Sequence, residues 1–194
     1  MKTFTIGKKK IVLKEEWMVG FITTWIVGLL AHAYRFFNFL PIWDSIYNFT
    51  GVGSTYTLGR WFLGYAGLIT SMFDLPWVNG AFSLFYISIV VILLTEMFEI
   101  KNKGMIVLCA AIFVSFPTVV SSFAYMYTAD AYLLAFLLAT LAVYLTWCVK
   151  KWGTIAGMVC LAFAMGIYQA YATVVIVLVL LYIIRQFVIE KLDF

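Results

Sequence analysis

WVNGAFSLFYISIVVILLTEMF, residues 77–98, is a nearly unbroken apolar stretch in which Glu96 is the only charged residue. A helix needs about 20 apolar residues to cross the hydrocarbon of a bilayer, where lipid offers the backbone no hydrogen-bond partners. This stretch therefore predicts a membrane-spanning helix. Similar stretches predict five further spans, at 17–37, 104–121, 130–149, 153–167 and 171–189.

The composition of the whole chain points to the same solvent. Of its 194 residues 65% are hydrophobic and only 11% are charged, and the mean hydropathy is +1.03. A soluble domain carries about 25% charged residues. No internal repeat and no soluble linker divides the chain. We therefore expect one all-α membrane domain over 1–194, a polytopic bundle of about six transmembrane helices.

Basic residues lie on alternate connections between the predicted spans. They are Lys2 to Lys14, Lys101 with Lys103, Lys150 with Lys151, and Arg185 with Lys191. The positive-inside rule assigns these connections to the cytoplasm, which explains the net charge of +4 without a nucleic-acid partner. Residues 1–16 and the C-terminus are thus predicted to be cytoplasmic, and the long connection 38–76 extracytoplasmic.

Within this connection, residues 59–73 are apolar but short for a span. If they crossed, every later basic loop would change sides, so a helix lying at the membrane interface is the simpler interpretation. Arg60, Gly64, Gly67, Ser71 and Asp74 follow one another at steps of three or four, which places them on one face of such a helix.

The predicted sidedness gathers polar residues on the extracytoplasmic face. They are His32, Arg35, Asp44, Arg60, Asp74 and Asp130. Charges are costly in the middle of a bilayer, so these side chains are expected in a wet cavity or at the interface.

Several of these residues also fit structural roles. Asp74 precedes Pro76 and fits an acid at a helix start. Asp130 equally fits a helix cap or, with Tyr127 beside it, a sugar-binding surface. His32 is expected to reach towards the lipid headgroups, whereas Arg35 and Asp44 favour a functional role.

Metal and nucleotide chemistry find no support in the sequence. His32 is the only histidine, and Cys109, Cys148 and Cys160 lack the spacing of metal ligands. No phosphate-binding glycine motif is present. We expect no metal site and no cofactor.

Six separated stretches resemble the bacterial O-antigen-type glucosyltransferase family, polytopic enzymes of the GT-C class that use lipid-linked sugars. They are HAYRFF (32–37), PIWDSIYN (41–48), GRWF (59–62), NG (79–80), YTADAY (127–132) and GIYQAY (166–171). The matches occur in order over about 20–188, and the resemblance is to the N-terminal portion of these longer proteins.

The resemblance implies a donor, an acceptor and a membrane. The donor is a polyprenyl-phosphate-linked glucose, the acceptor is a cell-surface glycan, and the protein lies among the lipids of the bacterial inner membrane. Asp44, an acid in the first outer loop, matches the position of the catalytic base. The same resemblance implies substrate-binding roles for Arg35, Arg60, Asp130, Tyr127, Tyr168 and Gln169, the two arginines holding the phosphate. Because the resemblance covers only the N-terminal portion of these proteins, it is also compatible with a truncated chain that is inactive alone.

A non-enzymatic membrane protein is the alternative: a flippase for lipid-linked sugars, a binding subunit or the remnant of a transporter. Transporters place polar or proline-interrupted positions along a path at mid-span. Here Pro117 is the main interruption and charges at mid-helix are lacking, which disfavours transport.

Overall fold

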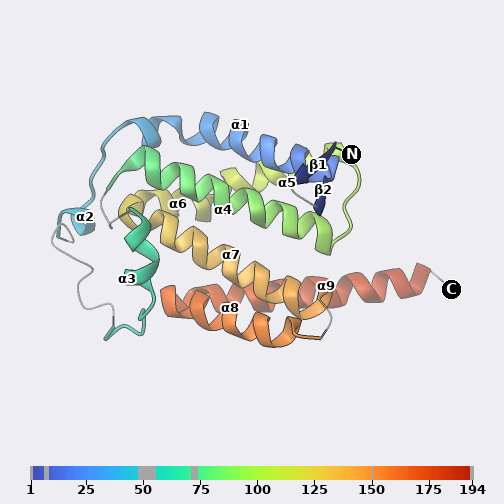
Figure 1. Ribbon diagram of the computed structural model, residues 1–194. Coiled ribbons are helices and arrows are strands. Elements are labelled where there is room, and N and C mark those ends of the chain that lie inside the picture. Colours follow the sequence, from blue (N-terminus) through green and yellow to red (C-terminus); the bar gives the residue numbers. More distant parts are fainter. Residues whose placement is uncertain (1, 7–8, 48–55, 71–73, 150, 193–194) are drawn as a thin grey trace.

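The computed structural model describes residues 2–6, 9–47, 56–70, 74–149 and 151–192 as a bundle of long helices running roughly side by side (Figure 1). The all-α prediction for the membrane bundle is confirmed. In chain order the elements are β1 (Lys2–Ile6), β2 (Lys9–Leu13), α1 (Glu15–Phe37), α2 (Trp43–Tyr47), α3 (Leu63–Ala66), η2 (Gly67–Thr70), α4 (Pro76–Met97), α5 (Lys103–Ser115), α6 (Pro117–Ser122), η3 (Phe123–Tyr125), α7 (Met126–Cys148), α8 (Gly153–Ile167), η4 (Gln169–Tyr171) and α9 (Ala172–Leu192), where η marks a 3-10 helix.

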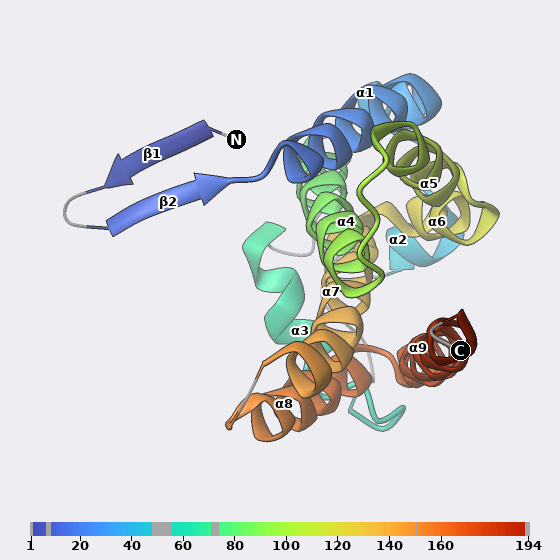
Figure 2. The ribbon, with the colours of Figure 1, turned by 90° about the vertical axis from the view of Figure 1, so that its right-hand side faces the viewer.

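The order of packing places α4 and α7 at the centre of the bundle. Helix α4 contacts α1 on one side and α7 on the other, and α7 also contacts α8 and α9 (Figure 2). Small residues on α1 allow the close approach to α4: a Cβ on Gly20 would lie 3.0 Å from Val91, and one on Gly28 would overlap Leu84. Close backbone approach at small residues is the usual way in which membrane helices associate.

Proline divides the third predicted span. Helix α5 ends at Ser115, Phe116 adopts an extended conformation, and α6 begins at Pro117. Proline has no N–H for the helix ladder and is favoured at a first helical position, so the break falls where the sequence places it. After the 3-10 turn η3 the chain reverses into α7.

Two glycines bring α8 against α7. A Cβ on Gly157 would lie 2.6 Å from the carbonyl oxygen of Ala142, and one on Gly153 would overlap that of Leu145. Helix α8 has only 15 residues. Among the described residues, four apolar helical stretches can cross a membrane by length and composition, Glu15–Phe37, Pro76–Met97, Lys103–Cys148 and Gln169–Ile189. The third of these contains α5, α6 and α7, and therefore two of the six predicted spans.

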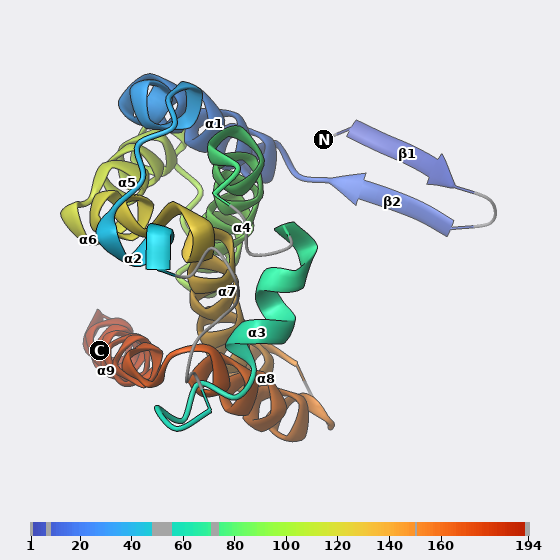
Figure 3. The ribbon, with the colours of Figure 1, turned by 90° about the vertical axis from the view of Figure 1, so that its left-hand side faces the viewer.

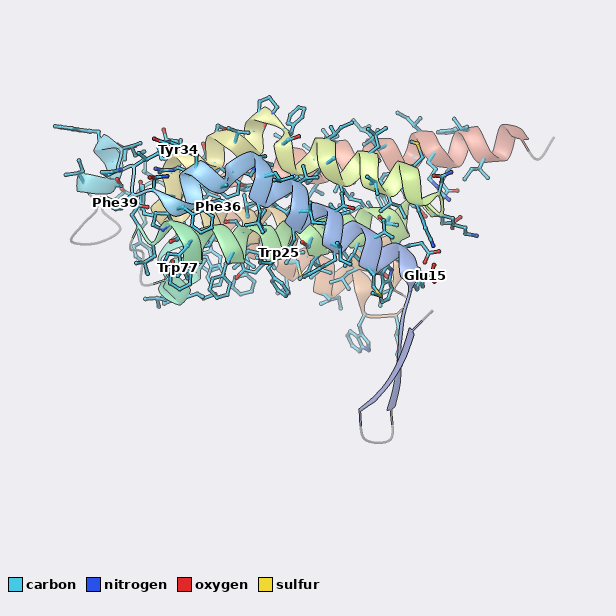
Figure 4. The ribbon with its side chains drawn as sticks, turned by 90° about the horizontal axis from the view of Figure 1, so that it is seen from above. Glu15, Trp25, Tyr34, Phe36, Phe39 and Trp77 are labelled. Atoms are coloured by element: carbon cyan, nitrogen blue, oxygen red, sulfur yellow. The ribbon has the colours of Figure 1, made fainter. Side chains whose placement is uncertain are left out.

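The two ends of the bundle differ in character. Both chain termini lie at one end, called here the terminal end, where α1 begins and α9 finishes (Figure 1). The opposite end, called the loop end, carries α2, α3, η3 and η4 (Figure 3). Figure 4 shows Glu15 at the terminal end, and Tyr34, Phe39 and Trp77 at the loop end.

Ion pairs concentrate at the terminal end. Lys14 pairs with Glu96 at 2.6 Å, Lys103 with Glu15 at 2.5 Å, and Arg185 with Glu99 at 2.9 Å. The indole N–H of Trp17 also donates to Glu96, at 2.6 Å. These contacts join α1, α4, α5 and α9, so that the residues predicted to face the cytoplasm share one end of the molecule.

Two segments differ from the sequence expectation. The N-terminal residues form an antiparallel hairpin, in which Phe4 pairs with Ile11, and it projects sideways from the bundle (Figure 2). The helix expected over 59–73 begins later: Gly59 lies in a turn with φ of 74°, and among the described residues of this range the helical ones are those of α3 and η2. A left-handed glycine ends regular structure at that point. Ser71, expected on the same face, lies outside the described residues.

Candidate active site at the loop end

The turn before α3 is docked onto the break between α8 and α9. The side-chain amide of Gln169 donates to the carbonyl oxygen of Leu58 at 2.8 Å, and the N–H of Phe62 donates to the carbonyl oxygen of Gly166 at 2.8 Å. A Cβ on Gly59 would lie 2.5 Å from the Gln169 amide nitrogen. Trp61 covers Gly166 with similar closeness, so segments more than a hundred residues apart are held in contact.

This docking places Arg60 over an aromatic ring. The guanidinium carbon lies 4.4 Å from the centroid of the Tyr168 ring, a cation–π contact. One terminal nitrogen of Arg60 lies 3.5 Å from the hydroxyl of Tyr132, at the limit of a hydrogen bond. The Tyr132 and Tyr168 rings are 5.5 Å apart. The Arg60 Nε is buried and has no hydrogen-bond partner in the described structure, so the cation keeps donor capacity.

Asp130 lies deeper, at the centre of a second cluster. Its side chain is 2% exposed, and it accepts hydrogen bonds from the Thr70 hydroxyl at 2.9 Å and from the Asn79 amide at 3.1 Å. The side-chain Oδ1 of Asn79 in turn accepts a hydrogen bond from the backbone N–H of Leu75 at 3.0 Å. Three elements, η2, α4 and α7, are therefore fastened by one buried carboxylate. Helix α7 begins at Met126, so Asp130 is a full turn inside it, and the alternative of a helix cap is wrong.

The expectation that Asp74 caps the start of α4 is also wrong. Helix α4 has Leu75 at its N-cap position without a side-chain cap, and Pro76 opens its first turn. Both Asp74 carboxylate oxygens are buried and have no hydrogen-bond partner within the described residues. Burial raises the pKa of the Asp74 carboxyl, while the nearby positive charge of Arg35 acts in the opposite direction.

Arg35 holds the loop end together through backbone carbonyls. Its Nε donates to Phe123 at 2.8 Å, and its terminal nitrogens donate to Ala124 at 3.1 Å and to Leu40. Three of its five donors are thus engaged where α1 ends and α7 begins. Arg35 still supplies a positive charge there, but it is less available to a ligand than Arg60.

The remaining predicted residues lie at the same end. Asp44 is exposed in the first turn of α2, and Tyr127 is half-buried in the first turn of α7. Figure 3 shows α2 and α3 on this end of the bundle. The structure therefore brings Arg60, Tyr168 and Gln169 into one contact group and Asp130 into the adjoining network. The roles of Asp44 and Tyr127 stay predictions.

The expectation that His32 reaches towards the lipid headgroups is wrong. It is 5% exposed, its Nε2 lies 2.9 Å from the Val114 carbonyl oxygen, and its ring lies 4.6 Å from that of Phe123. The carbonyl is accessible because the helix is interrupted just beyond it, before Pro117. His32 is therefore a packing residue of the bundle.

Sequence reasoning did not assign roles to Thr70, Asn79 and Tyr132. Asn79 carried a usable signal, because an amide inside an apolar span must find a polar partner. For Thr70 and Tyr132 the sequence signal was weak, since threonine and tyrosine are common at membrane boundaries. Within the described ranges, no three histidine, cysteine or acidic residues are grouped as a metal site.

A bundle of apolar helices with Arg60 packed on a tyrosine at one end is the architecture expected of a polytopic membrane protein. Residues 33–193 match the family described as glucosyl transferase GtrII, and the chain belongs to that family. The suspected relationship to O-antigen-type glucosyltransferases is confirmed. No curated protein and no solved structure matches the chain.

Proposed function

We propose that this chain transfers a glucosyl residue from a polyprenyl-phosphate-linked donor to a cell-surface glycan at the extracytoplasmic face of the bacterial inner membrane. Membership of a glucosyl transferase family supports the reaction class. The apolar spans suit a donor that is itself anchored in lipid. Both termini then face the cytoplasm, and the loop end faces outwards.

The observation that carries the proposal is the Arg60 cation on Tyr168. Among the described residues its Nε has no hydrogen-bond partner and Arg60 has no ion pair, and the guanidinium lies over the aromatic ring, so a phosphate can be bound there without displacing a described carboxylate. Negative charge on the donor phosphate grows as the glycosidic bond breaks. A fixed guanidinium in a poorly hydrated site stabilises that change. Arg35 adds a second positive charge from the end of α1.

The transfer is a single displacement. The acceptor hydroxyl oxygen attacks the anomeric carbon, the bond from that carbon to the phosphate oxygen breaks, and its electron pair leaves with the polyprenyl phosphate. Asp44 takes the proton of the acceptor hydroxyl as the new bond forms. The exposure of Asp44 on α2 suits contact with a glycan arriving from outside the membrane. Attack from the opposite side inverts the anomeric centre.

The other predicted residues surround this reaction. Tyr168 and Tyr127 offer aromatic surface for a sugar ring, and Gln169 fixes the turn that carries Arg60. Asp130 was expected to orient sugar hydroxyls, but its deep burial and its two hydrogen bonds favour a positioning role. It ties the segment after α3 to α4 and α7.

The test is glucosyl transfer by the purified chain in proteoliposomes, with labelled polyprenyl-phosphate glucose as donor and bacterial surface polysaccharide as acceptor. Asp44→Asn is expected to lower kcat by about 100-fold or more, the usual contribution of a general base. Arg60→Met is expected to raise the donor KM. Glu99→Gln, an exposed change at the terminal end, is the matched control. Unchanged turnover in Asp44→Asn removes that residue from the mechanism.

A further inference from the structure

Asp74 is an acid of the loop end that has no structural role in the contacts described above. Both oxygens are buried and neither has a hydrogen-bond partner in the described chain. Burying a carboxylate without partners is unfavourable, and native proteins rarely leave such a group unsatisfied unless it has a function. Asp74 caps no helix, which removes the ordinary structural reason for an acid at this position.

The backbone that follows Asp74 is anchored by hydrogen bonds. The N–H of Leu75 donates to Asn79, and Asn79 donates to Asp130. Thr70, four residues before Asp74, donates to the same Asp130 carboxylate. The anchoring of Leu75 limits the conformational freedom that Asp74, the residue before it, loses on binding a ligand.

The charge beside Asp74 suggests what that ligand is. Arg35 lies close enough to act on the carboxylate electrostatically, yet no hydrogen bond joins the two side chains in the described structure. Three of the five Arg35 donors are engaged with the carbonyl oxygens of Phe123, Ala124 and Leu40. The described residues thus place a cation within electrostatic reach of a carboxylate whose acceptor capacity is unused. A sugar phosphate offers the complementary pair, a negative phosphate and neighbouring hydroxyl donors.

We propose that Asp74 binds hydroxyl groups of the donor's glucosyl ring, and that it thereby contributes to the choice of sugar. The inference rests on the proposed glucosyl transfer and extends it to specificity. Asp74 as a whole is only half-buried, so its carboxylate lies just beneath the surface of the loop end. A carboxylate built to accept a substrate hydroxyl discriminates strongly against an analogue that lacks it, because the carboxylate is then left unpaired.

The experiment compares the intact chain with Asp74→Ala and Asp74→Asn in proteoliposomes. Each is given polyprenyl-phosphate glucose and its 2-, 3-, 4- and 6-deoxyglucose counterparts. The original chain is expected to lose about 10- to 100-fold in kcat/KM with at least one deoxy donor, as for a hydrogen bond to a charged group. Asp74→Ala is expected to fall by a similar factor with glucose, and to transfer glucose and that deoxy sugar within about threefold of each other.

The outcomes separate the two proposals. Equal losses of Asp74→Ala with every donor indicate a structural role and overturn the inference, as does the absence of any loss. The inference also fails if the original chain discriminates against no deoxy donor. If the original chain transfers none of the sugars, the proposed function itself fails. Folding is checked by thermal unfolding in detergent, where both variants are expected to match or exceed the original Tm.

Discussion

The guanidinium carbon of Arg60 lies 4.4 Å from the centre of the Tyr168 ring, although the two residues are more than a hundred positions apart in the sequence. The contact is formed because Gln169 and Gly166 bind the backbone on either side of Arg60. An arginine fixed in this way can receive a phosphate without losing much side-chain freedom.

Replacing the ring should therefore weaken donor binding. Tyr168→Leu is expected to raise the KM for polyprenyl-phosphate glucose about fivefold to tenfold, because a cation–π contact contributes roughly 1 kcal/mol or more when partly desolvated. Tyr168→Phe keeps the ring and is the matched control, with a change of less than about twofold. The measurement is initial rate against donor concentration. Equal effects of both changes would point to the hydroxyl instead.

Arg60 should not be replaceable by lysine. Arg60→Lys keeps the charge but loses the planar fork that lies on Tyr168. We expect kcat/KM to fall about tenfold with the circular dichroism spectrum unchanged. Full activity in this variant would show that charge alone is sufficient.

The Asp130 network should contribute to stability. Asn79→Ala removes the donor to Asp130 and the acceptor for Leu75, and leaves buried groups unpaired. The expected loss is about 1–3 kcal/mol in the free energy of unfolding, measured by denaturant titration in detergent micelles. The control is Asn38→Ala, since Asn38 makes a single exposed bond to Tyr34 and should cost less. A larger loss in the control would contradict the network's role.

The stability of the folded chain should depend on Asp74 in a definite direction with pH. Its folded pKa is raised by burial, so the unfolded chain releases this proton at lower pH than the folded chain does. The contribution of Asp74 to stability is therefore greatest below the usual range of an aspartate, and it falls as pH rises through the higher, folded pKa. The Tm of Asp74→Asn, relative to that of the original chain, should therefore rise as pH increases through this window and then stay constant. Parallel Tm curves for the two proteins between pH 3 and pH 8 would contradict the shift.

Packing between α7 and α8 should tolerate no extra atom at Gly157. A Cβ there would meet the Ala142 carbonyl oxygen at 2.6 Å, a contact with backbone that side-chain motion cannot relieve. Gly157→Ala is expected to destabilise the chain by about 1–3 kcal/mol, measured as denaturant unfolding in detergent. Ala162→Leu, on the exposed face of α8, serves as the control and should change stability by less than about 0.5 kcal/mol.

Apolar length was sufficient to predict the long helices, since lipid leaves the backbone no hydrogen-bond partners outside the helix itself. Asp130 and Asp74 could not be assigned in this way. Whether an acid near a helix start is a cap depends on where the helix begins, and helix boundaries shift by a turn when tertiary contacts compete with local signals. Helix α7 begins at Met126 rather than at Asp130, and Asn79 supplies the acceptor near the start of α4.

The same reasoning explains why the docking of the first loop escaped prediction. Gln169 is an ordinary amide in the sequence, and its partner is a backbone carbonyl at Leu58 that has no sequence signature. Gly59 and Gly166 were visible as glycines, but the partners that require their small size are visible only in the fold.

Gly59 packs against Gln169, and Gln169 donates a hydrogen bond to Leu58, so the turn before α3 is joined to the residues that precede α9. A displacement of Arg60 would therefore be transmitted through Tyr168 and Gln169 to the first residues of α9, so that a change in the tilt of α9 and a change in the position of Arg60 are expected to accompany each other.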